Sequence, residues 1–233
     1  MVQLLSHCLG FRNHQIGFNK GGGSIYYPRL LAAKYTGENT ISHCHAEPTP
    51  TVLKMIKTLD LRPIILMRNL LDALVSRRDM LLTNKWAGNI LSKSAVNDFI
   101  SGSHEYQMDI IIDLFANTYM NFFAGWKQFR NDPALNPIYI TYQELINDEV
   151  ALVQRVAAEL DKSVSREAIK DISSKISSVG GINFFKGVEG RGKDALTRKQ
   201  IDALRKKATI VGCCDECFLG FKMCQQEDPL DEE

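Results

Sequence analysis

Apolar positions along this chain form two kinds of pattern, short continuous runs and longer stripes with helical spacing. The runs PIILM at 63–67 and NPIYITY at 136–142, with the shorter NTISHCHA at 39–46, predict β-strands. The stripes predict helices at 1–10, 28–35, 49–60, 70–82, 105–130, 143–160, 165–176 and 197–208. Apolar strands that alternate with helices are typical of a parallel sheet covered on both faces. We therefore predict an α/β fold with three layers, a central parallel sheet flanked by helices.

Local signals predict where some of these helices begin and where the chain is irregular. Thr49 is placed to cap the helix that follows it, and Thr197 with Gln200 forms a capping box. The mixed segment 83–103 is predicted to be irregular, and the Gly-rich, basic segment 177–196 to be a loop. No internal repeat or interior linker is visible. We predict one domain over 1–233, with a frayed acidic tail at about 225–233.

Composition narrows the class of protein. The chain has 233 residues, of which 45% are hydrophobic, enough to bury the core of one α/β domain. The net charge of +1 gives no bulk attraction to nucleic acid, so no nucleic-acid partner is expected. The most apolar long segment, 108–129, carries polar residues mostly four apart, which indicates a helix with one wet face and not a membrane span. We also see no secretory signal at the N-terminus.

Six cysteines bear on metal binding and on the redox compartment. Four of them lie in CCDECFLGFKMC, between Cys213 and Cys224, and Cys214 and Cys217 have the spacing of a zinc or redox pair. A second such pair is missing and no histidine lies nearby. This favours reduced thiols over a metal site and predicts a cytoplasmic protein that binds no metal.

Arg68 is the first candidate for chemistry, because a fully charged side chain directly follows the apolar run 63–67. In parallel α/β sheets ligands bind beyond the carboxyl ends of the strands, so Arg68 could hold an anion there. Ser76, eight residues on, could add a hydroxyl from the following helix. The alternative is an ion pair of Arg68 with Asp72 or Asp79.

The segment from this strand to Ser76 resembles one motif of the sulfotransferase family. That motif reads as a hydrophobic strand, Arg-Asn-Pro-x-Asp, and then Ser eight residues after the Arg. Arg68, Asn69, Asp72 and Ser76 match it, and Leu70 replaces the Pro. In the family the Arg and Ser hold the 3′-phosphate of the sulfuryl donor, 3′-phosphoadenosine-5′-phosphosulfate (PAPS).

Three further segments resemble family motifs, in the family's order. ISHCHA is similar to the strand end that presents the catalytic His, which implies His43 as the base and His45 as the reserve candidate. IYITYQEL is similar to the segment whose Tyr lies near the adenine, which implies Tyr142. FFKGVEGRGKDALT is similar to the loop that closes over the 3′-phosphate. Its matching residues are Lys186, Gly187, Gly190, Lys193 and Thr197.

The departures from the family pattern also carry expectations. Phe185 stands where the family has an Arg, and Arg191 of the same loop could supply the missing guanidinium. The segment 2–10 is similar to the family's first helix, which follows a donor-binding phosphate loop. Because nothing upstream supplies that loop here, we expect a sulfotransferase fold that is truncated at its N-terminus or degenerate there.

The resemblance implies an activity, a co-substrate and a set of contacts. It implies transfer of a sulfuryl group from PAPS to a hydroxyl of a small-molecule or carbohydrate acceptor, with no metal. Arg68, Ser76, Lys186, Gly187 and Arg191 are expected at the donor nucleotide. The alternative is an inactive or truncated relative that binds adenosine 3′,5′-bisphosphate (PAP) or a protein partner. A small kinase is disfavoured, because no phosphate loop ending in Gly-Lys-Ser/Thr is present.

Overall fold

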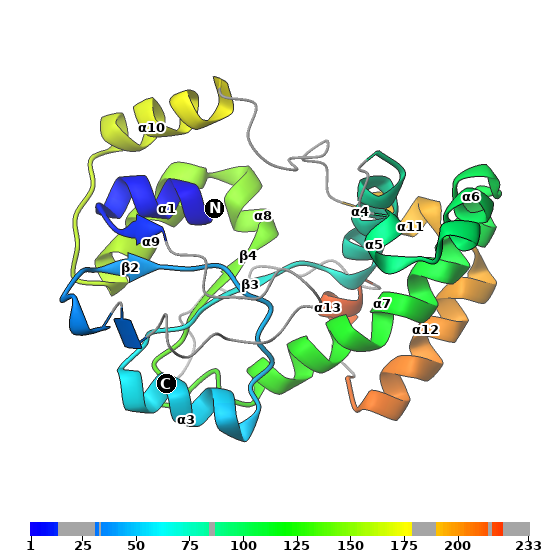
Figure 1. The fold of residues 1–233 in the computed structure, drawn as a ribbon, viewed down its shortest axis with the longest axis horizontal. Helices are drawn as coiled ribbons and strands as arrows, with labels where there is room; N and C mark the ends of the chain where they lie inside the picture. The colour runs from blue at the N-terminus through cyan, green and yellow to red at the C-terminus, as the bar shows by residue number, and fades with distance from the viewer. Residues whose placement is uncertain (14–30, 33, 84–86, 179–189, 214–215, 221–233) are drawn as a thin grey trace, which may run out of the picture. The chain divides into compact units, whose positions relative to one another are not determined.

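The computed structural model describes residues 1–233 except 14–30, 33, 84–86, 179–189, 214–215 and 221–233 (Figure 1). The chain divides into two compact units. The first consists of Met1–Met67 with Phe122–Phe184, and the second of Arg68–Asn121 with Phe185–Glu233.

Two parallel pairs of strands lie in the first unit. β1 (Arg12–Asn13) pairs with β2 (Thr40–Ile41), and β3 (Ile64–Met67) pairs with β4 (Ile138–Thr141), with Met67 opposite Thr141. The prediction of an α/β fold with parallel strands is confirmed. The strand predicted at 39–46 is shorter than expected, because the pairing with β1 ends at Ile41.

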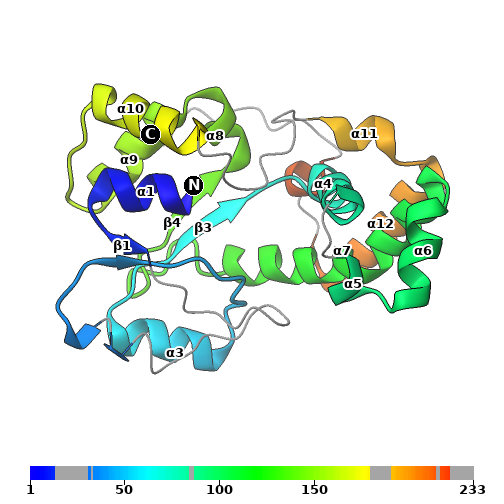
Figure 2. The ribbon, with the colours of Figure 1, turned by 45° about the horizontal axis from the view of Figure 1, so that its top comes forward.

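Helices cover both faces of these strands. Figure 2 shows α3 (Pro50–Leu59) on one side of the strands and a group of helices on the other, so the described part of this unit has three layers. The helices of the second group are α1 (Val2–Leu9), α8 (Tyr142–Asn147), α9 (Glu149–Glu159) and α10 (Arg166–Ser178). The one helix predicted at 143–160 is in fact α8 and α9. Asp148 separates them because its carboxylate accepts a hydrogen bond of 2.9 Å from the Ala151 N–H and caps α9.

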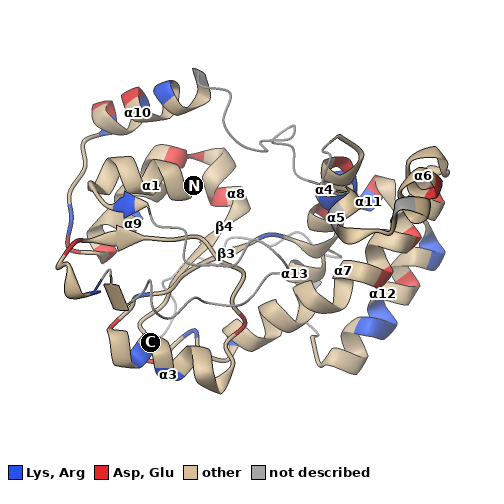
Figure 3. Cartoon of the chain, in the orientation of Figure 1, with Lys and Arg blue, Asp and Glu red and all other residues tan. Residues whose placement is uncertain are grey.

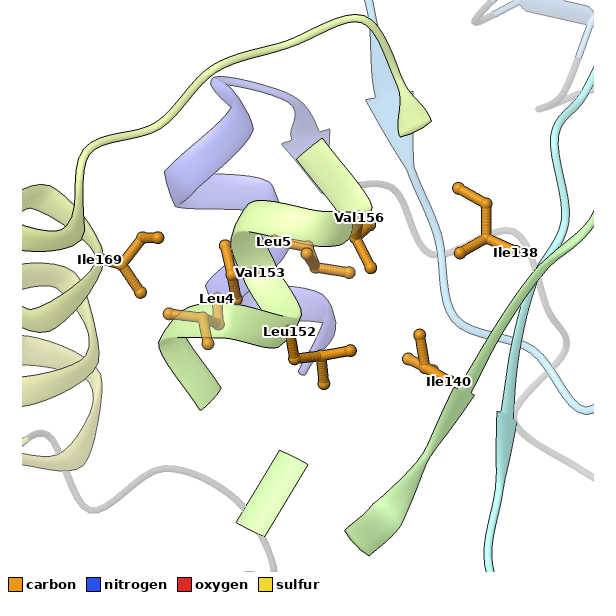
Figure 4. Packing of buried hydrophobic residues seen from close by; sticks show 8 residues of the cluster. All are labelled: Leu4, Leu5, Ile138, Ile140, Leu152, Val153, Val156 and Ile169. Carbon is orange, nitrogen blue, oxygen red and sulfur yellow. The ribbon is translucent and has the colours of Figure 1, made fainter. Parts of the chain in front are cut away.

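The core of the four-helix side follows from the alternation of side chains along β4. Ile138 and Ile140 point to the same face, where both are 1% exposed. Figure 4 shows them facing the other labelled residues of the same buried cluster. These partners are Leu4 and Leu5 of α1, Leu152, Val153 and Val156 of α9, and Ile169 of α10. On the opposite face Ile65 of β3 packs with Val52 and Ile56 of α3.

The second unit is helical in its described residues. Its long helix α7 (His104–Lys127) passes into the first unit after Asn121. The other helices are α4 (Leu70–Thr83), α5 (Ala87–Ile90), α6 (Lys93–Ser101), α11 (Arg191–Ala195), α12 (Arg198–Val211) and α13 (Glu216–Leu219). Figure 3 shows basic residues along α12, where Arg198 forms an i,i+4 pair with Asp202, the one acidic residue of this helix.

The prediction that 83–103 is irregular is wrong, because α5 and α6 lie there. The Ser92 hydroxyl caps α6 by accepting a hydrogen bond of 3.3 Å from the Ala95 N–H. Phe99 is fully buried, and the buried Gln107 side chain donates to the Phe99 carbonyl at 2.9 Å. The short helix α11 likewise interrupts the loop predicted at 177–196.

The predicted helix caps are confirmed. The Thr49 hydroxyl accepts from the Val52 N–H at 3.3 Å, and Thr197 and Gln200 form the predicted capping box. The tail at 225–233 lies outside the described residues, and the assignment of 1–233 to one domain stays a prediction.

Leu5 tests the core of the first unit. The side chain is 1% exposed, so Leu5→Ala leaves a cavity and should lower the free energy of unfolding by about 2–5 kcal/mol. Ile210→Ala is the control: Ile210 is 85% exposed, and the change should stay within about 0.5 kcal/mol. Urea unfolding measures both. Equal effects of the two substitutions would contradict the assignment of Leu5 to the core.

Candidate active site

The two candidate histidines lie in the segment after β2. His43 and His45 are exposed, and their ring centroids are 4.8 Å apart in an edge-to-face arrangement. The predicted strand would have placed them on one side by alternation. They instead come together in non-strand backbone beyond Ile41.

A tryptophan holds the end of this segment in place. The Trp126 Nε1–H donates a hydrogen bond of 2.9 Å to the carbonyl of the buried Ala46. Gly125 packs closely on Pro48, since a Cβ on Gly125 would lie 2.9 Å from the Pro48 Cγ. The last turn of α7 therefore fixes the chain just after His45.

The local environment sets the protonation of the first histidine. Although the His43 side chain is exposed, neighbouring protein atoms shield its ring from part of the solvent, which lowers its pKa from the ordinary 6.5, and the positive charge of the chain's amino terminus lowers it further. The ring is therefore neutral at pH 7, which is the form that can accept a proton. Burial raises the pKa of Cys44 between the two histidines, so its thiol stays protonated and is a poor nucleophile.

Tyr142 is the first residue of α8, directly after β4. Thr141 and Glu144 form a capping box there: the Thr141 hydroxyl accepts from the Glu144 N–H at 3.1 Å, and the Glu144 carboxylate accepts from the Thr141 N–H at 2.7 Å. This cap fixes the turn from strand to helix and so the backbone of the half-buried Tyr142.

In the second unit, Arg68 lies two residues before the start of α4. The Asn69 side-chain oxygen accepts a hydrogen bond of 2.9 Å from the Asp72 N–H, so Asn69 caps this helix. Ser76 lies further along α4 and is half-buried, like Arg68. Leu70, which replaces the family's Pro, is fully buried.

The Asp72 carboxylate joins this helix to the segment 190–192. It is 1% exposed and accepts three hydrogen bonds, from the Asn69 side-chain amide at 2.8 Å, the Gly190 N–H at 2.8 Å and the Gly192 N–H at 2.7 Å. Gly192 has no room for a side chain, because a Cβ there would lie 2.3 Å from the Leu71 Cβ.

An ion pair joins the same two segments further along α4. The Arg191 guanidinium donates to Asp79, which also accepts from Arg78 at 3.2 Å. Asp72, Ser76 and Asp79 are spaced by four and three residues, so they share one face of α4. The two carboxylates that sequence reasoning offered as partners for Arg68 therefore both bind other groups.

Two residues of this region were not expected from the sequence. The Arg77 guanidinium lies over the Phe115 ring, 4.4 Å from its centroid, and Phe115 stacks on Tyr119. Burial raises the pKa of Tyr119, and the charges of Arg77 and Arg68 oppose this shift. The sequence placed Tyr119 only in an apolar helix stripe, and no local signal marked Arg77.

Comparison with models of known protein families identifies the family of this chain. The model of the sulfotransferase domain matches residues 27–179. The chain belongs to the sulfotransferase family. A search of curated proteins finds no match. The prediction of the family is thus confirmed, while the roles of the individual site residues stay predictions.

Solved structures of sulfotransferases share the fold. Mouse sulfotransferase SULT7A1 complexed with PAP superposes with a TM-score of 0.58 at 18% identity, over 78% of this chain and 68% of that chain. Retinol dehydratase in complex with androsterone and the inactive cofactor PAP gives a TM-score of 0.52 at 18% identity, over 78% of this chain. The chain spans 56% of that second protein.

Some predicted features of this family member fall outside the described residues. Lys186, Gly187 and Cys214 are among them. Within the described ranges, no group of three His, Cys, Asp or Glu residues is arranged to hold a metal ion, and Cys8 and Cys44 are free thiols. No helix in the same ranges is long and apolar enough to cross a membrane. The cytoplasmic location stays a prediction.

The lowered pKa of His43 predicts how stability depends on pH. As the pH falls below the ordinary pKa of 6.5, His43 binds a proton in the unfolded chain before it does so in the folded chain. The free energy of unfolding therefore falls as the pH falls. Replacing His43 by Gln removes this contribution. Between about pH 7 and about pH 5 the wild type should lose more stability than His43→Gln, as measured by urea unfolding. Parallel pH profiles for the two proteins would show that His43 titrates normally.

Proposed function

We propose that this chain transfers a sulfuryl group from PAPS to a hydroxyl of a small-molecule or carbohydrate acceptor. The observation that carries the proposal lies in the second unit. There the segment 190–192 is bonded to the helix that begins just after Arg68 and carries Ser76. Two motifs more than a hundred residues apart in the sequence, both expected at one phosphate, thus meet on α4.

The proposed roles follow the chemistry of each side chain. Arg68, Ser76, Lys186, Gly187 and Arg191 bind the 3′-phosphate, to which guanidinium, ammonium, hydroxyl and backbone N–H groups donate hydrogen bonds. Tyr142 contacts the purine. Two solved neighbours carry PAP, which supports PAPS as the co-substrate.

The proposed reaction needs one base and no metal. The acceptor oxygen attacks sulfur in line as the bond from sulfur to the 5′-phosphate oxygen breaks, and that electron pair leaves with PAP. His43 takes the acceptor's proton as the new sulfur–oxygen bond forms. A neutral imidazole suits this role, and the lowered pKa of His43 favours the neutral form. His45 is the second candidate for the base.

The proposed acceptor is a small molecule or carbohydrate that carries a hydroxyl. Retinol dehydratase was solved with androsterone, and a steroid hydroxyl is one kind of small-molecule acceptor that fits the reaction. The alternative function is a non-catalytic relative that binds PAP or a protein partner. It predicts nucleotide binding without sulfuryl transfer.

Arg68 tests nucleotide binding. Arg68→Ala removes a charge-assisted hydrogen bond to phosphate and should weaken PAP binding by roughly 1.5–3 kcal/mol, or roughly 10- to 150-fold. Arg198→Ala is the matched control, because its side chain is 85% exposed on α12. Isothermal titration calorimetry measures both. If the two variants bind PAP equally well, Arg68 is not a phosphate ligand.

The two histidines test the chemistry. His43→Ala should reduce transfer of labelled sulfate from PAPS to a panel of alcohols and phenols by at least about 100-fold, the usual contribution of a general base. His45→Ala should leave most of the activity, and both variants should keep their affinity for PAP. The opposite pattern would assign the base to His45. A wild-type chain that binds PAP without any transfer would favour the non-catalytic alternative.

A further inference from the structure

Asp72 is the one carboxylate at the start of α4 that is almost wholly buried, at 1% exposure. A buried carboxylate is tolerated only where hydrogen-bond donors compensate for its lost water. Here one oxygen accepts from the Gly192 N–H at 2.7 Å. The other accepts from the Gly190 N–H and from the Asn69 amide, both at 2.8 Å.

The geometry of these bonds matches an ionised carboxylate better than any other side chain. Both oxygens receive a backbone N–H from the segment 190–192, so each must be an acceptor. An Asn at this position would turn its own NH₂ towards one of those N–H groups and leave a buried donor without an acceptor. A Glu would place its carboxylate one methylene further from the α4 backbone, away from the position at which Asp72 receives these N–H groups.

The segment that Asp72 holds carries Arg191, whose guanidinium reaches Asp79 on the face of α4 that also carries Ser76. Gly190 has a φ of 83°, in the left-handed region, so the backbone turns sharply at the point where its N–H meets Asp72. The carboxylate therefore fixes both the turn and the residue that follows it.

We propose that Asp72 is a positioning residue that orders the segment 190–192 against α4 for recognition of the nucleotide's 3′-phosphate. The inference rests on the proposed function and deepens it. Asp72 does not touch the nucleotide: it acts through two backbone N–H groups and through the position of Arg191. Replacing Asp72 should weaken the binding of nucleotides that carry a 3′-phosphate and leave the binding of nucleotides that lack one unchanged.

The test compares PAP with adenosine 5′-phosphate, which lacks the 3′-phosphate. Asp72→Asn should raise the dissociation constant of PAP at least about ten-fold, because one buried N–H loses its acceptor and the segment shifts. The affinity for adenosine 5′-phosphate should change by less than about two-fold. Asp194→Asn is the matched control, since Asp194 is an exposed carboxylate further along the same short helix α11, and it should change neither affinity.

A second variant tests the same role in case Asp72→Asn does not fold. Asn69→Ser removes the amide that donates to Asp72 but keeps a hydroxyl that can cap α4. It should weaken PAP by a smaller factor, again without loss for adenosine 5′-phosphate.

The outcomes separate this inference from the proposed function. Equal losses for both nucleotides in Asp72→Asn and Asn69→Ser would overturn the positioning role, because general damage to the fold does not distinguish the two ligands. Unchanged PAP binding in both variants would overturn it as well. A wild-type chain that does not bind PAP rejects the proposed function, and this inference with it.

Discussion

A carboxylate that is buried away from water needs hydrogen-bond donors from the protein, and this requirement determines which groups pack at the start of α4. Asp72 obtains them from the Asn69 side chain and from the backbone of Gly190 and Gly192, so helix α4 and a segment over a hundred residues later are bound together. The close approach needs a residue without a side chain, which Gly192 supplies. The contact between α4 and the segment 190–192 thus depends on the Asp72 carboxylate, on two backbone N–H groups and on the missing side chain of Gly192. The phosphate-binding role proposed for Arg68, Ser76 and Arg191 depends on this contact.

A simpler constraint acts where the chain passes from a strand into a helix. The first backbone N–H groups of a helix have no acceptor within the helix and need one from elsewhere. Thr141, at the end of β4, and Asn69, two residues after β3, satisfy such groups by accepting from the Glu144 and Asp72 N–H groups. At most two residues therefore separate each strand from the helix that follows it. Tyr142 and Arg68 stand at these two transitions, where the chain leaves the apolar core and polar chemistry becomes possible.

The sequence was informative wherever a structure depends on nearby residues. The strands at 64–67 and 138–141 and the caps at Thr49 and Thr197 follow from local patterns, and the family follows from short motifs. The segment 83–103 was predicted to be irregular because its apolar residues show only weak helical spacing. Helix α6 is stabilised there by the burial of Phe99 and by a hydrogen bond from Gln107 of α7, and neither contact is visible in the local sequence. The role of Asp72 was missed for the same reason. Its partners Gly190 and Gly192 are distant in sequence, although its match to the family motif was a signal that it matters.

The histidine pair, which includes the base proposed above, lies in a segment that packing and a hydrogen bond hold in place. Trp126 fixes the chain after His45 through the Ala46 carbonyl, while partial shielding from solvent lowers the pKa of His43 and keeps its ring neutral. Because the two ring centroids are only 4.8 Å apart, a positive charge on either ring disfavours a charge on the other. In the proposed reaction, the proton that His43 takes from the acceptor hydroxyl is therefore best accommodated while His45 is neutral. The proposal thus gives the second histidine an effect through its charge that needs no contact with the acceptor.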